Sequence, residues 1–325
     1  MTPNILVCGG AGYIGAHMCE ALAQAGAGIV VFDSLAGGRR EQARWGELVV
    51  GDLRDPLALE ALFAGRRFDA VVHFAGKIVV SESVRDPARY YDHNVTGTLN
   101  LLQAMRRHGC PPLVFSSTAA IYGDPAYTPI DEAHPRAPVN PYGRSKAYVE
   151  AMLADFQAAY GQKSVSLRYF NAAGASASGL VGEMHEPETH LIPNVLRAGR
   201  DGGTVDVYGT DYPTPDGSCV RDYVHVADLA RAHLAALRYL GDGGASAAFN
   251  LGSERGYSVL EVIAAAERVV GRPIRRNLSA RRPGDPPILV ASAAKARAVL
   301  GWTPVDSDLA TIIGSAWRWE NRARG

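Results

Sequence analysis

The segment Gly9-Gly10-Ala11-Gly12-Tyr13-Ile14-Gly15 constrains the fold of this chain more than any other. It follows a short apolar run, 4–8, and opens a longer amphipathic run, 13–25, so it joins a strand to a helix. Glycines at this spacing permit a tight turn and let the backbone approach a pyrophosphate at the N-terminus of the helix. The segment therefore predicts the dinucleotide-binding turn of a parallel α/β sheet.

The rest of the first half repeats this alternation of short apolar and longer amphipathic runs. The predicted strands are 4–8, 28–32, 47–50, 70–73, 113–116 and 164–169, and the predicted helices are 13–25, 56–64, 88–108 and 143–160. Continuous apolar strands that alternate with helices are typical of a doubly wound parallel sheet, a Rossmann α/β fold.

The second half changes character after Asn171, where a run of Gly, Ala and Ser predicts a loop. Helices are predicted at 190–200, 226–240, 257–270 and 306–320, and a short strand near 247–251 is predicted to return to the main sheet. We therefore expect an NAD-binding Rossmann domain over 1–171. A smaller α/β substrate lobe over 172–325 would be interleaved with it.

Composition excludes several classes of partner. The 325 residues carry 33 Lys+Arg and 33 Asp+Glu, and this balance gives no indication of nucleic-acid binding. There is no apolar run of 18 residues for a membrane span, and no signal peptide fits before the first strand. The cysteines Cys8, Cys19, Cys110 and Cys219 are scattered, which suits thiols in a reducing compartment. We expect a cytoplasmic protein without nucleic-acid or membrane partners.

Two carboxylates at strand ends bear on the choice of cofactor. Asp33 stands 18 residues after Gly15, where a carboxylate accepts hydrogen bonds from a ribose diol and repels a 2′-phosphate. This position favours NAD over NADP. Asp52 ends the third strand, where it could meet the adenine amino group. A turn-forming or helix-capping role remains an alternative for both residues.

A candidate acid/base pair stands at the start of the predicted helix 143–160. Tyr142 and Lys146 are four residues apart, so they lie on one face of the helix. Tyrosine titrates near pH 10, but a neighbouring ammonium favours the phenolate, which could then take a proton from an alcohol that loses a hydride. Thr118 follows the fifth strand, and its hydroxyl could hold that alcohol against Tyr142. Plain turn chemistry is the alternative for Thr118.

These residues, with further motifs, resemble the extended short-chain dehydrogenase/reductase family and, within it, the UDP-sugar 4-epimerases. The likeness covers nearly the whole chain, and its second-half motifs are the more specific. The motifs are 9–15, 73–76, 90–95, 122–123, 141–146, 167–171, 209–217, 220–226 and 281–285.

The resemblance implies interconversion of UDP-glucose and UDP-galactose through a 4-keto sugar, with tightly held NAD. Tyr142 would be the acid/base, Lys146 would hold the nicotinamide ribose and lower the Tyr142 pKa, and Thr118 would orient the sugar hydroxyl. The residues implied at the cofactor are Gly9, Gly12, Tyr13, Ile14, Gly15, Asp33, Ser34, Asp52, Leu53, Phe74, Ala75, Gly76, Asn94, Tyr142, Lys146, Tyr169 and Phe170. The residues implied at the UDP-sugar are Thr118, Tyr142, Asn171, His190, Leu191, Tyr208, Arg221, Arg282, Asp285 and Leu289.

Within the substrate set the resemblance also implies individual roles. Arg221 and Arg282 would grip the diphosphate, because a guanidinium fork suits that group. Asp285 would meet the uridine ribose, and Leu289 would line the sugar pocket.

The chain departs from the family pattern at two places. Lys77 comes one residue after Gly76, whereas close relatives carry a Lys two residues after it, where this chain has Ile78. Its contact with the nicotinamide ribose is therefore left open. His190 stands where relatives have Asn and belongs to a run, 185–190, that is rich in His and Glu. Because Pro187 breaks any helix that would align these side chains, no metal site is predicted.

Competing functions remain at this point. A 4,6-dehydratase would place an Asp-Glu pair where this chain has Ala119-Ala120. Epimerases of UDP-pentoses or UDP-N-acetylhexosamines stay open, and the retention of Tyr142 and Lys146 argues against a non-catalytic NAD-binding regulator. A homodimer is expected through 88–108 and 143–160. Part of an apolar stripe in 88–108 supports it, although that stripe could equally pack on the sheet; its residues are Val95, Leu99, Leu102 and Met105.

Overall fold

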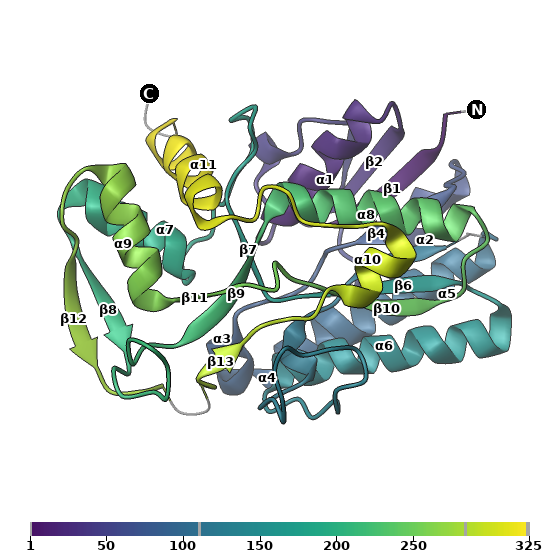
Figure 1. Cartoon of the computed structure of the whole chain (residues 1–325). Helices are drawn as coiled ribbons and strands as arrows, with labels where there is room; N and C mark the ends of the chain where they lie inside the picture. The colour runs from purple at the N-terminus through teal and green to yellow at the C-terminus, as the bar shows by residue number, and fades with distance from the viewer. Residues whose placement is uncertain (1, 110–111, 283–284, 323–325) are drawn as a thin grey trace.

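A computed structural model describes residues 2–109, 112–282 and 285–322 of the chain. Cys110 and two residues of the 281–285 motif, Pro283 and Gly284, lie outside the described residues. The described elements form a large parallel sheet with helices on both faces, and beside it a smaller group of helices and short strands (Figure 1).

The main sheet has seven parallel strands in the order β10-β6-β5-β4-β1-β2-β3. The order reverses direction between β1 and β4, which is the crevice where ligands bind in open α/β sheets. The doubly wound parallel fold predicted from the sequence is confirmed. The strands of this sheet are β1 (Asn4–Cys8), β2 (Gly28–Asp33), β3 (Glu47–Val50), β4 (Ala70–His73), β5 (Leu113–Ser116), β6 (Ser164–Tyr169) and β10 (Ala247–Leu251).

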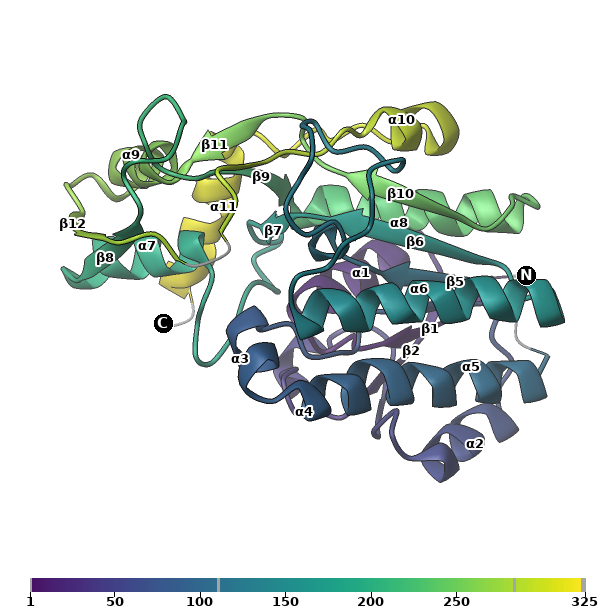
Figure 2. The ribbon, with the colours of Figure 1, turned by 90° about the horizontal axis from the view of Figure 1, so that it is seen from below.

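Helices bury both faces of this sheet, which explains why its strands are apolar without alternation. In β1, Ile5 and Val7 pack into the core under α1 and α8, whereas Leu6 packs into the core under α2, α5 and α6. Figure 2 shows α6, α5 and α2 side by side along one face. The helices of the sheet are α1 (Tyr13–Gln24), α2 (Pro56–Ala64), α3 (Val80–Arg85), α4 (Pro87–Tyr91), α5 (Gly97–Arg107), α6 (Pro141–Tyr160), α8 (Val226–Gly241) and α10 (Ala294–Leu300).

The predicted helix 88–108 is divided in the structure. A π turn, η2 (Asp92–Thr96), separates α4 from α5, so the helical run is continuous in direction but not in hydrogen-bond pattern. Leu102 and Met105 are fully buried in the core under the sheet, whereas Val95 and Leu99 are half-buried. Half of the apolar stripe of this segment therefore packs inside the monomer.

The smaller group of elements has a core of its own. Ile192 and Val195 of α7, Ile263 of α9 and Ile312 of α11 belong to one buried cluster. The four helices predicted after Asn171 are all found, although α8 packs on the main sheet. Three of the six strands in the smaller group have only two or three residues and carry no periodic signal, whereas β8 alternates and was not predicted. The elements are β7 (Asn171–Ala173), α7 (Leu191–Asp201), β8 (Thr204–Tyr208), β9 (Val220–His225), β11 (Gly256–Ser258), α9 (Val259–Val270), β12 (Arg275–Ser279), β13 (Ile288–Leu289) and α11 (Leu309–Arg322).

Strand β9 pairs with β7, β11 and β13 of the smaller group and leads directly into α8, which packs on the main sheet. Strand β7 follows β6 after one residue, so the end of the main sheet leads directly into the smaller group. Two short 3-10 turns, η1 (Arg40–Gln42) and η3 (Ala119–Ile121), complete the description. Within the described ranges, no helix has the length and apolar character needed to cross a membrane.

Candidate active site

The glycine-rich turn lies between β1 and α1 as predicted. Gly9 has a φ of +84°, and a Cβ there would lie 2.5 Å from the backbone nitrogen of Ala75. A Cβ on Gly15 would lie 2.1 Å from the carbonyl oxygen of Gly9. No side chain of the described residues caps α1, so the first amides of the helix face the turn without such a partner. This cradle fits a dinucleotide pyrophosphate.

Asp33 stands at the end of β2, beside this turn. Its carboxylate is buried and accepts hydrogen bonds from the amides of Ala11 (3.0 Å) and Leu35 (2.8 Å). Burial raises the pKa of Asp33, although these two amides oppose the shift. Asp33 thus has the turn-capping role that the sequence left open. Each oxygen accepts one bond here and keeps capacity for a ribose hydroxyl.

Ser34 and Asp52, which were also predicted to contact the cofactor, have other polar partners in the structure. The amide of Ala36 donates to the Ser34 hydroxyl at 3.4 Å. Asp52 forms a 2.7 Å ion pair with Arg54, whose hydrogen bonds lower the pKa of Asp52. Leu53, the next residue, is buried in the core under the sheet.

Tyr142 and Lys146 lie on the first two turns of α6. The helix begins at Pro141, and Asn140 caps it by accepting a 2.8 Å hydrogen bond from the amide of Gly143. Thr118 follows the end of β5, and its hydroxyl accepts a 3.1 Å hydrogen bond from the amide of Ala120, the turn role that the sequence left open. The Thr118 side chain also lies beside that of Tyr142. The structure therefore brings the predicted hydroxyl and phenol together from segments 24 residues apart.

The Lys146 ammonium is buried beneath this pair. It donates to the carbonyl oxygen of Ser116 at 2.9 Å and lies 4.8 Å from the ring centroid of Phe115. Burial lowers the pKa of Lys146 to about 8. The pKa of Tyr142 differs from the sequence-based expectation: desolvation raises it, and the hydrogen bond with Thr118 opposes the rise. The protein alone thus does not provide the depressed Tyr142 pKa, because Lys146 donates to Ser116 instead.

Gly76 and Lys77, which follow β4, lie close to Lys146 and to Asn94. A Cβ on Gly76 would lie 2.9 Å from the Asn94 side-chain oxygen and 3.7 Å from Lys146 Nζ. Asn94 accepts from the amide of Lys77 (2.7 Å) and donates to the Ser145 hydroxyl (2.9 Å). Asn94 therefore ties this loop to α6, and Lys77 contributes to that tie through its backbone.

The remaining cofactor candidates lie near the ends of the central strands. Phe74 follows β4 directly and stacks at 4.7 Å on the ring of His233 from α8. Tyr169 ends β6, and its hydroxyl bonds to the Ser116 hydroxyl. Phe170 packs with Leu289 in a small cluster around Tyr122.

Three of the predicted substrate residues, Arg221, Asp285 and Leu289, lie where β9 meets β13. Leu289 is opposite Arg221 in this parallel pair. Arg221 and Asp285, which were assigned to different parts of UDP, form an ion pair with each other. The guanidinium of Arg282 lies 3.9 Å over the ring of Tyr208.

Two further candidates connect this region to its surroundings. Asn171 donates from its side chain to the carbonyl oxygen of Asp222 at 2.9 Å and so joins β7 to β9. His190 is the N-cap residue of α7, which begins at Leu191. Burial alone would lower the pKa of His190, but hydrogen bonds with Glu183 and Glu188 outweigh this effect and raise the pKa to about 10.

A buried polar network beneath the active site was missed by the sequence reasoning. The Ser117 hydroxyl donates to Glu150 Oε1 at 2.6 Å, and Arg168 Nε donates to the same oxygen at 2.9 Å. Arg168 also donates to the Tyr122 hydroxyl, which donates to Asn250. A signal was present, because Arg168 lies inside a strand predicted to be buried and so required a partner.

A parallel dinucleotide-binding sheet, with a Tyr/Lys pair on α6 and a Thr hydroxyl at the end of β5, defines an NAD-dependent enzyme of the short-chain dehydrogenase/reductase class. The chain belongs to the NAD dependent epimerase/dehydratase family, whose model matches residues 5–252.

Individual relatives support the same assignment. A UDP-glucose 4-epimerase of Rhizobium meliloti (strain 1021) is 52% identical over 321 residues, covering 98% of this chain and 97% of that protein. The crystal structure of UDP-glucose 4-epimerase from Brucella ovis in complex with NAD is 47% identical, with a TM-score of 0.95, and covers 97% of this chain and 98% of that one. The UDP-Glc/GlcNAc 4-epimerase of Campylobacter jejuni is 40% identical, with a TM-score of 0.87, and covers 98% and 99%. The resemblance predicted from the motifs is confirmed.

Proposed function

We propose that this protein interconverts UDP-glucose and UDP-galactose by reversible oxidation at C4 of the sugar, through a 4-keto intermediate. The observation that carries the proposal is the position of Tyr142 on α6, beside Thr118, with buried Lys146 one helical turn away and the glycine-rich turn nearby. This is the arrangement that an alcohol oxidation needs, with a base, a hydroxyl that orients the substrate and a cation beside them.

The roles of the residues follow from their positions. Tyr142 takes the proton from the 4-hydroxyl as a phenolate and returns it when the keto group is reduced. Thr118 holds the hydroxyl against Tyr142. Gly9, Gly15 and the first amides of α1 would hold the pyrophosphate of NAD, and Asp33 its adenosine ribose. When bound, NAD supplies the hydride acceptor and donor for C4.

A bound oxidised cofactor would also lower the pKa of Tyr142, which burial raises in the protein alone. The site holds the phenol partly buried, and this burial favours the neutral form. When bound, the oxidised cofactor would supply positive charge that favours the phenolate of Tyr142. We infer that the base becomes competent only when the oxidised cofactor is in place.

Incubation of the purified protein with UDP-galactose tests the proposal directly. UDP-glucose should form without added cofactor, because the NAD is retained, and denaturation should release NAD or NADH. Absence of any UDP-glucose from protein that contains NAD would contradict the assignment. The dehydratase alternative has no support from the site, because Ala119 and Ala120 form the turn η3 and carry no acid/base group.

The range of sugars depends on Leu289. In the structure Leu289 is half-buried and packs with Phe170 and Tyr122. We infer good activity on the two hexoses and weak activity on UDP-N-acetylgalactosamine, because an acetamido group must displace this packing. The Campylobacter relative, named for both UDP-Glc and UDP-GlcNAc, supports the inclusion of acetamido sugars in the test.

We also infer a cytoplasmic homodimer whose interface includes α6. The Tyr148 side chain on α6 is 51% exposed and stacks with Tyr91 of α4, which leaves aromatic surface for a partner. The buried half of the stripe on α5 gives no support, so this inference rests on α6 and α4. Light scattering that shows only monomer at micromolar concentration would reject the dimer. The division into an NAD-binding domain over 1–171, joined by β10, and a substrate lobe over 172–325 is likewise our proposal.

A further inference from the structure

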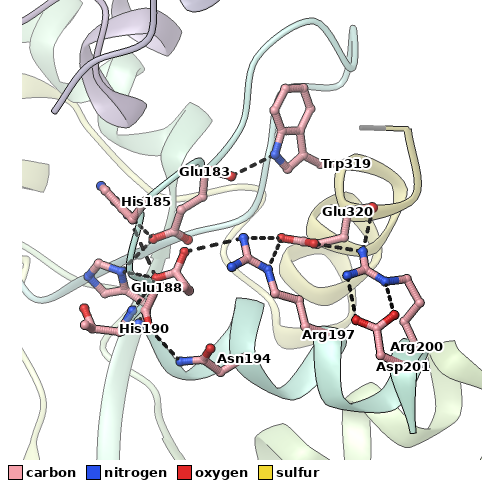
Figure 3. A network of polar contacts seen from close by, with 11 residues as sticks. Glu183, His185, Glu188, His190, Asn194, Arg197, Arg200, Asp201, Trp319 and Glu320 are labelled. Atoms are coloured by element: carbon pink, nitrogen blue, oxygen red, sulfur yellow. Dashed lines mark hydrogen bonds and ion pairs between the residues drawn. The ribbon is translucent and has the colours of Figure 1, made fainter. Parts of the chain in front are cut away.

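Four potential metal ligands converge in the loop that leads into α7. The loop turns at Pro187, which places Glu183 and His185 on one arm and Glu188 and His190 on the other (Figure 3). One ligand atom from each of these four side chains lies within 4.8 Å of all the others. Pro187 excludes a helix that would align these residues, and on that ground the sequence predicted no metal site. Two non-helical arms bring them together instead.

The spacing of the ligand atoms approaches that of a tetrahedral site. His190 Nδ1 lies 2.7 Å from Glu183 Oε1 and 3.0 Å from Glu188 Oε1. His185 Nδ1 lies 3.0 Å from Glu183 Oε1 and 4.0 Å from Glu188 Oε1. Four ligands at about 2.1 Å from a central ion are about 3.4 Å apart in a tetrahedron. The four separations differ from that value by about 0.4–0.7 Å, so side-chain rotations of this order would be needed to form the coordination shell.

The charges of the cluster leave room for a cation. The Glu183 and Glu188 side chains are only 7% and 3% exposed, so two carboxylates are removed from water at one point. Among the described residues, Glu188 Oε2 has no hydrogen-bond partner. His190 supplies one positive charge, 2.7 Å from Glu183 and 3.0 Å from Glu188. The guanidinium of Arg197 is 3.8 Å from Glu188 Oε2 and is already paired with Glu320 at 3.0 Å. The negative charge at the centre is thus only partly compensated.

The surroundings hold the two arms in position. The indole nitrogen of Trp319 on α11 donates to the carbonyl oxygen of Glu183 at 2.9 Å, as Figure 3 shows. The ring of Tyr13, in the glycine-rich turn, packs edge-to-face against His185. The Asn194 side chain donates to the carbonyl oxygen of Glu188 at 3.4 Å. Supporting contacts of this kind are what a metal centre requires around its ligands.

We propose that Glu183, His185, Glu188 and His190 form a binding site for one divalent transition-metal ion of the zinc type. Two imidazoles and two carboxylates suit Zn²⁺, and four protein ligands leave no open position for substrate, so the role is structural. The ion would fasten the loop 181–190 between the start of α1 and the ends of α7 and α11. The outer ring nitrogen of His190 would stay available to the nucleotide sugar.

Metal binding to the full-length protein tests the site. Protein stripped by dialysis against a chelator is titrated with Zn²⁺ against a chromophoric competitor. We expect one tight equivalent per chain. The variants His185→Gln and Glu188→Gln should each weaken that affinity by on the order of 100-fold, since even the loss of an outer contact costs 10- to 100-fold. The matched control is His108→Asn, which removes an exposed imidazole 2.9 Å from Glu60 and should change nothing.

A second set of measurements tests the metal site even if a variant folds poorly. Co²⁺ added to the stripped wild-type protein should give the strong visible absorption of tetrahedral coordination, and Zn²⁺ should raise the melting temperature of wild type but not of Glu188→Gln. Binding that is equally tight in all variants would place the metal elsewhere and overturn the proposal. Failure of the stripped wild type to bind Zn²⁺ more tightly than the two variants would overturn it as well. Neither the metal titration nor the melting temperature depends on turnover, so a failure of the metal site can be distinguished from a failure of the proposed function.

Discussion

Replacement of Glu150 by Ala should destabilise the protein by about 3–5 kcal/mol, the usual cost of removing one partner of a buried ion pair. Glu150 lies on α6, one turn after Lys146, and its side chain is 5% exposed. It pairs with Arg168, which is also 5% exposed, and accepts the hydrogen bond of the Ser117 hydroxyl. The substitution leaves the Arg168 guanidinium buried with the Tyr122 hydroxyl as its remaining side-chain partner.

The free energy of unfolding lost in Glu150→Ala includes the cost of leaving Arg168 buried without its partner, so it exceeds the net stabilisation by the ion pair. A second variant separates these two contributions. Glu150→Met combined with Arg168→Met removes both charges, and it should be less destabilising than Glu150→Ala alone. The matched control is Glu60→Ala, which breaks an ion pair with Arg107 at the surface and should change stability far less. Urea denaturation followed by circular dichroism measures all three.

The same substitution should also affect catalysis, because Ser117 directly precedes Thr118. Without the bond from Ser117 to Glu150, the end of β5 is less firmly held against α6, and turnover should fall even where the protein remains folded. The reasoning is refuted if Glu150→Ala costs no more stability than Glu60→Ala. It is also refuted if the double Met variant is the least stable of the set.

Four further outcomes follow from the site. Tyr142→Phe should retain the fold and bound NAD but lower turnover by about 10²–10⁴-fold, and near wild-type turnover would remove Tyr142 as the acid/base. Lys146→Met should be more stable than wild type at pH 7. Burial holds the pKa of Lys146 in the folded protein at about 8, below the unfolded value of about 10.5. Between these two pH values the unfolded chain therefore binds more protons than the folded protein. In denaturation experiments the stability of wild type should accordingly rise relative to that of the variant as the pH rises from about 8 to about 10.5. Asp33→Ser should narrow the preference for NAD over NADP in binding titrations, and equal affinities in wild type would overturn the ribose role. Leu289→Ser should favour UDP-N-acetylgalactosamine and Leu289→Tyr should exclude it, by roughly 5- to 150-fold in specificity constant; if neither variant shifts the preference, Leu289 does not line the pocket.

Local sequence determined the scaffold of this protein. Runs of apolar residues and the glycine spacing of 9–15 predicted all seven strands of the main sheet, because buried parallel strands and their connecting helices leave periodic signals within short windows. The pairing of Tyr142 with Lys146 was also readable, since four residues on a helix fix a common face. Short strands such as β13, with two residues, gave no such signal.

Tertiary structure decided the partners and the charges. The approach of Thr118 to Tyr142, the ion pair of Arg221 with Asp285 and the division of the stripe on α5 all depend on how distant segments pack. The raised pKa of Tyr142 and the convergence of the loop 181–190 have the same origin. Desolvation and long-range contact are properties of the packed interior, and a window of local sequence contains neither.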